Sequence, residues 1–168
     1  MGEQKNLSSQ EGVEKLKKLA KAADICMFAT NLTGNPISAR PMSTRDVDDD
    51  GTIYFYSRDS SDKNAEISKD DRVQLFYSNN SDYEYMSVFG RASIVEDEAL
   101  AKELWTNFAK AWFSGGVDDP ELTVIKVVPE NVYYWDTKHN KMVNLVKMAL
   151  SALTGTETDD GVYGHINV

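Results

Sequence analysis

Cysteine and histidine are scarce in this chain of 168 residues, which has one of the former and two of the latter. A single cysteine, Cys26, excludes an internal disulfide, and its position in the apolar run Ile25–Ala29 predicts a buried, inert thiol. A reducing, cytoplasmic location fits such a chain best. His139 and His165 have no Cys-x-x-Cys pair and no second histidine at helical spacing, so we infer no metal site.

Basic residues are fewer than acidic residues. The chain carries 27 acidic and 18 basic residues and a formal charge of -9, which argues against a general attraction to nucleic acid or to anionic membranes. No uninterrupted apolar stretch reaches the length of about 18 residues that a spanning helix needs, and the N-terminal residues contain no apolar signal segment. We therefore expect neither nucleic-acid nor membrane partners, and any phosphate site must be local.

What the sequence does contain is a succession of short strand patterns. The spacing of Ser8 and Glu11 matches a capping box, and apolar residues recur at helical intervals behind it, which predicts a helix over about 9–23. A short capped helix is predicted over 60–69. Runs rich in β-branched and aromatic residues predict strands over about 25–30, 36–47, 52–57, 73–77, 83–95, 122–128 and 132–135, with a bulge or a close backbone approach at Gly90.

Two further helical patterns lie in the second half of the chain. Apolar residues from Leu100 to Trp112 recur at helical spacing and predict a second long helix, which ends at Ser114-Gly115-Gly116. Residues 142–153 form an amphipathic pattern. Because the strands do not alternate regularly with helices, we expect one domain over 1–168, of the mainly β class, built as a closed antiparallel barrel with peripheral helices.

Three segments could form a binding site. They are Arg40–Arg45 on the second strand, Tyr56-Ser57 with Ser60–Lys63 where a strand ends and a helix begins, and Tyr133–Asp136 late in the chain. Hydroxyls, free amides, a helix dipole and a lysine converge at the second segment, a combination that suits a phosphate monoester. Plainer explanations stay open, because the first arginine could pair with a surface carboxylate, the serines could only cap a helix, and the tryptophan could only fill the core.

These segments resemble those of the pyridoxamine 5'-phosphate oxidase-like flavin-binding split barrels, and in particular their bacterial general stress protein branch. The resemblance spans nearly the whole chain. It is carried, in the same order, by Ala39-Arg40-Pro41-Met42, Phe55-Tyr56-Ser57 with Ser61-Asp62-Lys63, Val88-Phe89-Gly90-Arg91-Ala92, Trp112-Phe113-Ser114-Gly115-Gly116 with Asp118-Asp119-Pro120, and Tyr134-Trp135-Asp136. It implies an antiparallel split barrel that binds flavin mononucleotide (FMN), and a homodimer with the flavin at its interface.

The resemblance also implies which residues bind the cofactor. Arg40 and Lys63 would hold the phosphate of FMN, with the hydroxyl of Ser61 beside them. The strand that begins at Arg40 would run along the isoalloxazine ring, and Trp135 would reach the ring from the other subunit. The full implied set is Arg40, Pro41, Met42, Ser43, Thr44, Arg45, Tyr56, Ser57, Ser61, Lys63, Tyr85 and Trp135.

The chain departs from the oxidase that names the family at two places. After its tryptophan the oxidase has an Arg-Leu-His element that recognises the substrate phosphate, whereas this chain has Asp136-Thr137-Lys138-His139. Without that element nothing evident orients pyridoxamine phosphate, so this substrate is not expected. Asp62 stands where the oxidase has an arginine, which makes the phosphate pocket less cationic.

Three functional hypotheses remain open at this point. The first is an FMN-dependent oxidoreductase that passes a hydride or electrons between a small-molecule donor and an acceptor, in a stress response. The second is a flavin-binding or sensing stress protein without turnover, and the third is a barrel that binds haem or a deazaflavin. The sequence offers no evident acid or base, an absence that hydride transfer tolerates and hydrolysis does not.

Overall fold

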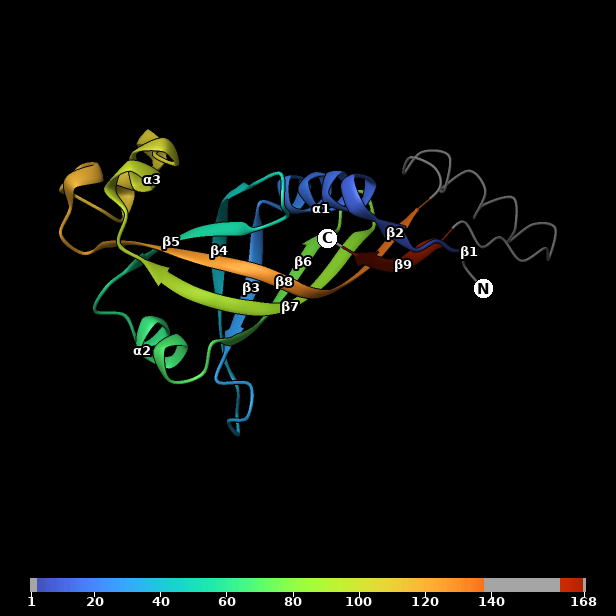
Figure 1. Cartoon of the computed structure of the whole chain (residues 1–168), viewed down its shortest axis with the longest axis horizontal. Helices are drawn as coiled ribbons and strands as arrows, with labels where there is room; N and C mark the ends of the chain where they lie inside the picture. The colour runs from blue at the N-terminus through green and yellow to red at the C-terminus, as the bar shows by residue number, and fades with distance from the viewer. Residues whose placement is uncertain (1–2, 138–160, 168) are drawn as a thin grey trace.

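Strands are the main secondary structure of the computed structural model, which describes residues 3–137 and 161–167. Six strands close a barrel in the order β8-β5-β4-β3-β6-β7, with β7 pairing back to β8, and all these pairs are antiparallel. The six are β3 (Ile25–Thr30), β4 (Ser38–Val47), β5 (Ile53–Arg58), β6 (Arg72–Asn79), β7 (Glu84–Val95) and β8 (Leu122–Thr137) (Figure 1). The predicted antiparallel barrel of the mainly β class is confirmed.

Apolar side chains fill the interior of the barrel. Buried and partly exposed residues alternate along β7, as the two-residue period of a strand requires. Phe28 of β3 meets Phe55 of β5 edge to face, with ring centroids 5.2 Å apart, and both rings are fully buried together with Leu75 and Val88. A small barrel packed in this way holds no ligand inside, so a binding site must lie outside its wall.

The helix α1 (Ser9–Ala23) has the predicted bounds and packs Leu16, Leu19 and Ala20 into the core. The predicted capping box does not form. Ser8 is the N-cap residue, but its side chain makes no capping hydrogen bond, and the carboxylate of Glu11 accepts a hydrogen bond from Lys5 at 3.1 Å instead.

The entry to α1 is held by strand pairing rather than by a cap. The short strands β1 (Glu3–Gln4) and β2 (Leu7–Ser8) pair in parallel with β9 (Gly161–Asn167), which in turn pairs with β8. The sequence patterns did not predict these three strands. The predicted amphipathic segment 142–153 lies outside the described residues.

The predicted pair of strands around Pro129 is one continuous strand, β8. The register between β7 and β8 shifts between Phe89 and Gly90, and Gly90 faces Pro129 there. A Cβ atom at Gly90 would lie 2.4 Å from the carbonyl oxygen of Val128, so no side chain fits. The close approach predicted at Gly90 is thus confirmed, and the irregularity accommodates a proline that cannot donate to the ladder.

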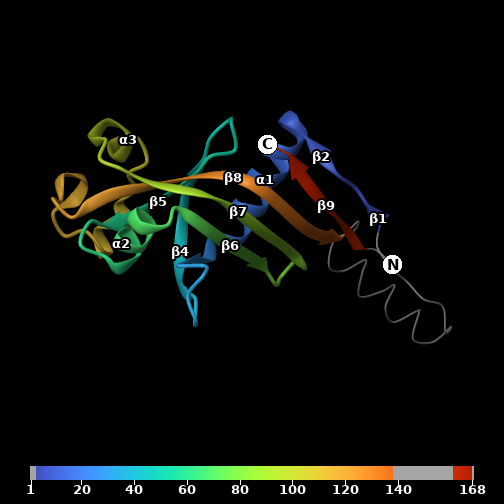
Figure 2. The ribbon, with the colours of Figure 1, turned by 60° about the horizontal axis from the view of Figure 1, so that its bottom comes forward.

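The prediction of a second long helix from Leu100 to Trp112 is wrong. Residues 98–118 form an arm built from the short α3 (Glu98–Glu103) and two single turns, η1 (Asn107–Ala111) and η2 (Gly116–Asp118). The helix breaks because the aromatic rings of this segment pack against Tyr56 of β5: Trp105 and Phe113 have ring centroids 5.9 and 6.0 Å from it. The arm and α2 (Asp62–Lys69), a helix that the sequence predicted, lie at the end of the molecule opposite β1, β2 and β9 (Figures 1 and 2).

Candidate functional site

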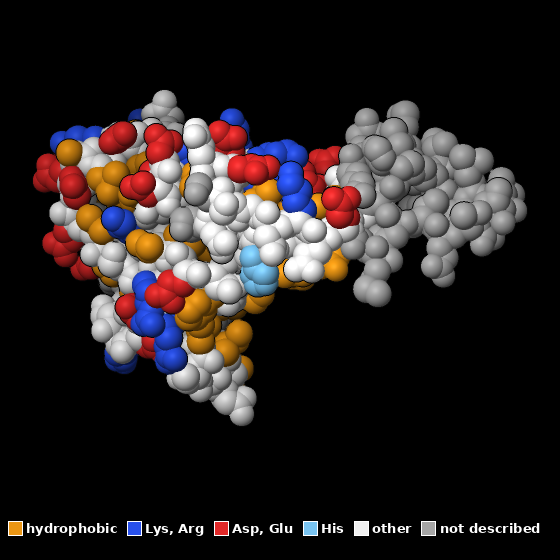
Figure 3. Space-filling view, turned by 45° about the vertical axis from the view of Figure 1, so that its right-hand side comes forward, with side chains coloured by type: hydrophobic (Ala, Val, Ile, Leu, Met, Phe, Trp, Pro, Cys, Tyr) orange, Lys and Arg blue, Asp and Glu red, His pale blue; other side chains and the backbone are white. Residues whose placement is uncertain are grey.

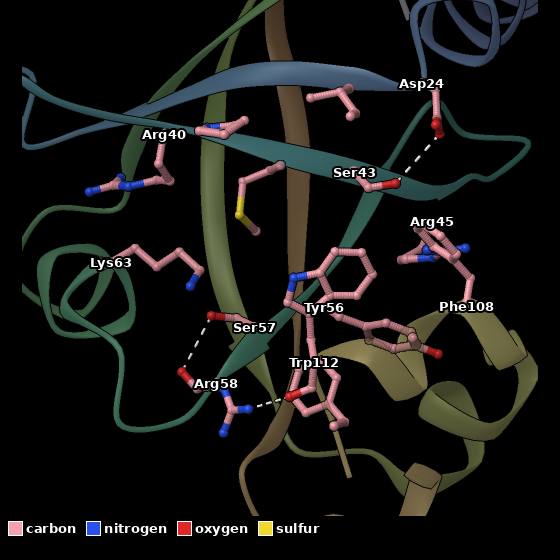
Figure 4. A pocket seen from close by; sticks show the side chains of 15 residues that line it. Asp24, Arg40, Ser43, Arg45, Tyr56, Ser57, Arg58, Lys63, Phe108 and Trp112 are labelled. Atoms are coloured by element: carbon pink, nitrogen blue, oxygen red, sulfur yellow. Dashed lines mark hydrogen bonds between the residues drawn. The ribbon is translucent and has the colours of Figure 1, made fainter.

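A cavity of about 550 Å³ lies outside the barrel wall, between β4, β5, α2 and the arm (Figure 4). This volume is in the range of small-molecule and cofactor sites. The cavity exists because the barrel is split here: β4 pairs with β5 only from Thr44 onward, so residues 38–43 have no register partner on β5. The other edge of the same stretch is paired with β3. One edge of β4 is therefore left open toward the cavity.

Most of the residues expected at the site do line this cavity. They come from β4, β5 and α2. On β4 they include side chains that point to either face of the strand, because its open edge exposes both faces. The lining residues that the sequence analysis named are Arg40, Pro41, Met42, Ser43, Arg45, Tyr56, Ser57 and Lys63.

Four expected residues do not line the cavity. The hydroxyl of Thr44 is bonded to the hydroxyl of Tyr77 at 2.8 Å. The hydroxyl of Ser61 lies 3.1 Å from that of Ser57, next to the lining but not part of it. Tyr85 and Trp135 face each other across β7 and β8 on the outside of the sheet. Within one chain the structure therefore does not bring these two aromatic residues to the cavity.

The sequence analysis missed the lining residues Asp24, Ile25, Arg58, Phe108, Ala109, Trp112 and Phe113. A signal existed for the last two, since the segment Trp112–Gly116 was one of those that carry the family resemblance. The sequence analysis assigns this segment to the end of a helix and leaves its aromatic residues open as core or as dimer interface, so neither was recognised as cavity lining.

One end of the cavity is cationic and consists of Arg40, Arg58 and Lys63. Arg58 also borders the aromatic residues, because its guanidinium lies 5.5 Å from the centre of the Phe113 ring. Lys63 extends from α2 toward Ser57 (Figure 4), and its ammonium group has no hydrogen-bond or ion-pair partner among the described residues. Burial lowers the pKa of Lys63, and the positive charges of Arg40 and Arg58 lower it further. A bound anion would relieve both effects, so this end suits an anionic group.

Arg40, unlike Lys63, has hydrogen-bond partners within the described residues. Its guanidinium donates to the hydroxyl of Thr30 and, at 2.9 Å, to the carboxylate of Glu66. Glu66 also accepts from the hydroxyls of Thr30 and Ser38, and these donors, that of Thr30 first, hold its pKa below the ordinary value despite partial burial. The pairing of Arg40 with a carboxylate, one of the plainer explanations, is thus present. A guanidinium has five N–H donors, so the pairing leaves others for a ligand.

A buried polar network fixes the junction between β5 and α2. Ser57 donates to the side-chain oxygen of Asn64 at 2.6 Å, and the Asn64 amide donates to Thr123 of β8 at 3.0 Å. Thr123 in turn donates to the backbone carbonyl of Ser57 at 3.1 Å. All three residues are buried. The network holds the start of α2, with its free amides and positive dipole end, at the cationic end of the cavity.

The other end of the cavity is aromatic and consists of Tyr56, Phe108, Trp112 and Phe113. Tyr56 donates to the carbonyl of Ala101 at 2.8 Å, and burial raises its pKa to about 12. The rings of Phe108 and Trp112 meet at 5.1 Å and yet are 67% and 53% exposed. This end presents apolar ring surface to solvent beside the cavity mouth.

Arg45 lies at the aromatic end. Its guanidinium stacks over the ring of Tyr56 at 5.6 Å and donates to the hydroxyl of Thr106 on the arm at 3.2 Å. Its Nε atom is buried and has no hydrogen-bond acceptor among the described residues. A buried donor left without an acceptor costs about 1–3 kcal/mol.

Aromatic side chains also gather on the outside of the sheet. A row of cross-strand partners runs from Pro41 through Met27, Phe76, Ser87 and Tyr133 to His165. Beside this row, Trp135 contacts the ring of Tyr133 at 4.6 Å. We call this surface the outer face. Ile25, Met27, Phe76 and Trp135 are all about half exposed on it, and hydrophobic side chains reach the surface in several places in the view of Figure 3.

The fold is that of a split antiparallel barrel with an external cavity that is cationic at one end and aromatic at the other. The chain belongs to the family described as "Pyridoxamine 5'-phosphate oxidase like", whose sequence profile matches residues 11–159. The family expectation is therefore confirmed. In the described residues we find no group of three or more His, Cys, Asp or Glu side chains that could hold a metal ion, and no helix long and apolar enough to span a membrane.

Individual relatives are distant. Protein bli-3 of Neurospora crassa is 27% identical over 111 residues, which are 61% of this chain and 53% of the fungal protein, so the chain spans about half the length of that relative. The crystal structure of a candidate general stress protein 26 from Jannaschia sp. CCS1 superposes with a TM-score of 0.73 at 23% identity, covering 93% of this chain and 95% of the other. A general stress FMN/FAD binding protein from Xanthomonas citri superposes with a TM-score of 0.64 at 22% identity, covering 76% and 92%.

Proposed function

We propose that the cavity binds FMN, with the phosphate at the cationic end and the isoalloxazine ring along the open edge of β4. Lys63 carries this proposal: its ammonium group is half-buried, points into the cavity and has no acceptor among the described residues. A phosphate dianion is the kind of acceptor that such a group lacks. The likeness to a Xanthomonas citri protein that binds FMN or FAD supports the choice of a flavin.

The remaining residues of the cavity fit a flavin as well. The first amides of α2 and the positive end of its dipole favour a phosphate, and Arg58 adds positive charge although its guanidinium is bonded to the carbonyl of Trp112. The open edge of β4 offers backbone donors and acceptors to the polar edge of a ring system. Two local negative charges oppose a phosphate: Asp62, exposed at the start of α2, and Glu66, which is paired with Arg40.

We further propose that the loaded protein is an oxidoreductase of small molecules that acts in a stress response. When bound, the flavin supplies two-electron chemistry between a small donor and an acceptor, and the protein supplies binding and orientation. The chain's own residues anchor the phosphate, hold the ring against β4 and shield it with the arm. Among the described residues, Asp24, which accepts a hydrogen bond from Ser43 at 3.4 Å, is the only carboxylate of the lining, and no histidine of the described part of the chain lines the cavity. Hydride transfer needs neither group.

The test of the cofactor proposal is the comparison of FMN, FAD and riboflavin binding to the wild type and to Lys63→Gln. We expect the substitution to weaken FMN binding by roughly 10- to 150-fold, the range of a charge-assisted hydrogen bond, and to leave riboflavin almost unchanged. Lys69→Gln, at the far end of the same helix, is the matched control. Equal losses for FMN and riboflavin would refute a phosphate contact at Lys63.

The test of catalysis is steady-state turnover of the FMN-loaded protein with reduced nicotinamides and several acceptors. An oxidoreductase should exceed the rate of the same concentration of free FMN. A rate no faster than free FMN would leave the second hypothesis, a flavin-binding stress protein without turnover.

We also propose that two copies associate through the outer face into a homodimer, with Trp135 of one copy reaching the cavity of the other. Four half-exposed apolar side chains on one sheet face support an interface. Phe76→Asp would place a charge in the middle of this face and should give monomers in sedimentation equilibrium. Tyr83→Asp, at the turn between β6 and β7, is the control. A wild type that is monomeric with intact FMN binding would refute the shared site.

A further inference from the structure

Lys63 differs from the ion-paired lysines of the chain in what its ammonium group faces. Lys17 donates to Asp49 and Lys18 donates to Glu84, and the hydrogen bond raises the pKa of each lysine. Lys63 has no hydrogen-bond or ion-pair partner among the described residues, and its pKa is lowered by burial and then by two neighbouring arginines. A lysine in such surroundings is more often present as the neutral amine, which is the nucleophilic form.

Lys63 also lies where a phosphate group would be held. It is the only lysine among the described residues that line the cavity, and Arg40 and Arg58 line the same end. Its side chain extends from α2 toward Ser57, whereas the lining carboxylate of Asp24 lies at the opposite side of the cavity (Figure 4). The amine therefore faces the cavity beside two guanidinium groups, the side chains best suited to bind a phosphate.

We propose that Lys63 is a site of acylation by acyl phosphates, small molecules in which a carboxyl group is joined to a phosphate. Arg40 and Arg58 would hold the phosphate and so place the adjoining carbonyl carbon beside the Lys63 amine. This inference deepens the proposed function and rests on it in one respect, because acylation and FMN binding would use the same phosphate-binding end. Acylation removes the positive charge of a lysine, so it would regulate the binding of the flavin phosphate.

The reaction transfers an acyl group and involves no oxidation or reduction. The Lys63 ammonium group first releases one proton to water. The neutral amine then attacks the carbonyl carbon, a C–N bond forms, and the C–O bond to the phosphate breaks. A second proton passes from the nitrogen to the leaving group, which departs as hydrogen phosphate while Arg40 and Arg58 stabilise its charge. Because the bound phosphate favours the ammonium form of Lys63, the rate should increase with pH.

The experiment compares two acetyl donors on the apo protein, both below saturation. Acetyl phosphate carries the phosphate, whereas the N-hydroxysuccinimide ester of acetic acid is neutral and lacks it. Lys69, exposed at the far end of α2, is the internal control, and cleavage after Glu66 puts the two lysines in different peptides for mass spectrometry. We expect the ratio of the rates at Lys63 and Lys69 to be roughly 10- to 150-fold higher with acetyl phosphate, the range of a charge-assisted hydrogen bond. An equal ratio with both donors would overturn the proposal.

Two controls connect the preference for acetyl phosphate to the cationic end. Inorganic phosphate should slow the acetylation of Lys63 but not that of Lys69, whereas sodium chloride at the same ionic strength should slow it less. Arg58→Gln should reduce the difference between the two donors. Because Arg58 also donates to the carbonyl of Trp112, the melting temperature of this variant is measured as well. If the variant does not fold, protection of the wild type by inorganic phosphate carries the test, and a rate at Lys63 that phosphate does not slow contradicts the proposal.

Failure of this inference can be told apart from failure of the cofactor proposal. If FMN binds more tightly than riboflavin but both donors give the same ratio, the acylation site is wrong and the cofactor proposal stands. If Lys63 prefers acetyl phosphate in a protein that binds FMN and riboflavin equally, the acylation site stands and the FMN phosphate is wrongly placed. The expected result is a donor preference together with a loss of FMN affinity after acetylation as large as that of Lys63→Gln. Unchanged FMN affinity after complete acetylation of Lys63 would overturn the regulation.

Discussion

The two ends of the cavity are held in place by different means. At the cationic end, side chains of the barrel and of α2 hold one another: Glu66 fixes Arg40, and the Ser57-Asn64-Thr123 network fixes the start of α2. At the aromatic end, Phe108 is exposed and sits on an arm that two arginines tie to the barrel. The first end is part of the folded core and the second is an attachment to it. We therefore expect changes at the cationic end to alter both stability and cofactor binding, and changes at the exposed Phe108 ring of the aromatic end to leave stability almost unchanged.

The largest expected effect is on the pH dependence of FMN affinity. Affinity should rise as the phosphate takes its second charge near pH 6, and it should fall again as pH rises through the pKa of Lys63, which burial and the neighbouring arginines hold below 10.5. The alkaline loss should reach about 1.5–3 kcal/mol, the value of a charge-assisted hydrogen bond. Fluorescence titration of FMN between pH 5 and 11 measures it.

Lys63→Arg is the control for this profile, because an arginine stays protonated over the whole range. The FMN affinity of the variant should still rise near pH 6, but it should not fall at alkaline pH. An alkaline fall of the same size in Lys63→Arg would assign the titration to another group.

The next effect concerns the network beneath the cationic end. Asn64→Ala removes the acceptor of the Ser57 hydroxyl and the donor to Thr123 in a buried site, so the free energy of unfolding should fall by about 1–3 kcal/mol. Urea denaturation of the apo protein measures it. Asn107→Ala, the same substitution at an exposed position of the arm, should cost less than about 0.5 kcal/mol. Equal losses in the free energy of unfolding at the two positions would contradict the proposed difference between the two ends of the cavity.

A smaller loss is expected for Glu66→Gln. The variant should lose about 0.5–1.5 kcal/mol at neutral pH, because the amide oxygen still accepts a hydrogen bond but the charge that holds Arg40 is gone. The folded pKa of Glu66 is lowered, so its contribution is present above the unfolded value of about 4.3 and disappears as pH falls through the folded value. The stabilities of the wild type and the variant should therefore converge in acid. A difference that persists at pH 2 would mean that the charge is irrelevant.

The smallest effect on stability is expected at the aromatic end. Phe108→Ala removes an exposed ring and should change the free energy of unfolding by no more than about 0.5 kcal/mol, within the scatter of surface substitutions. Thermal unfolding of the apo protein is sufficient to check this. A loss of several kcal/mol would show that the arm is part of the core and that the comparison between the two ends is wrong.

The parts of the molecule that the sequence predicted well are those where local pattern and tertiary packing agree. The helix over 9–23 and the strands from Ile25 to Val95 show periodic apolar residues that pack into the barrel. The arm did not follow its pattern, because Trp105 and Phe113 gain more from packing on Tyr56 than from a continuous helix. The sequence analysis did not predict β9, because β9 is a strand through its pairing with β8, and a short stretch of sequence does not show such a distant pairing.

The sequence by itself determined the mainly β barrel, the family and the strand and helix that carry Arg40 and Lys63, because periodicity and motif order are local properties of the chain. Only the tertiary structure decided where the barrel splits and that Glu66 holds Arg40, whereas Lys63 has no partner among the described residues. It also decided that Phe108 and Trp112 line the same cavity as Arg45. The reason is physical: charges and rings become a site through their distances and burial in three dimensions, and residues far apart in the chain set both.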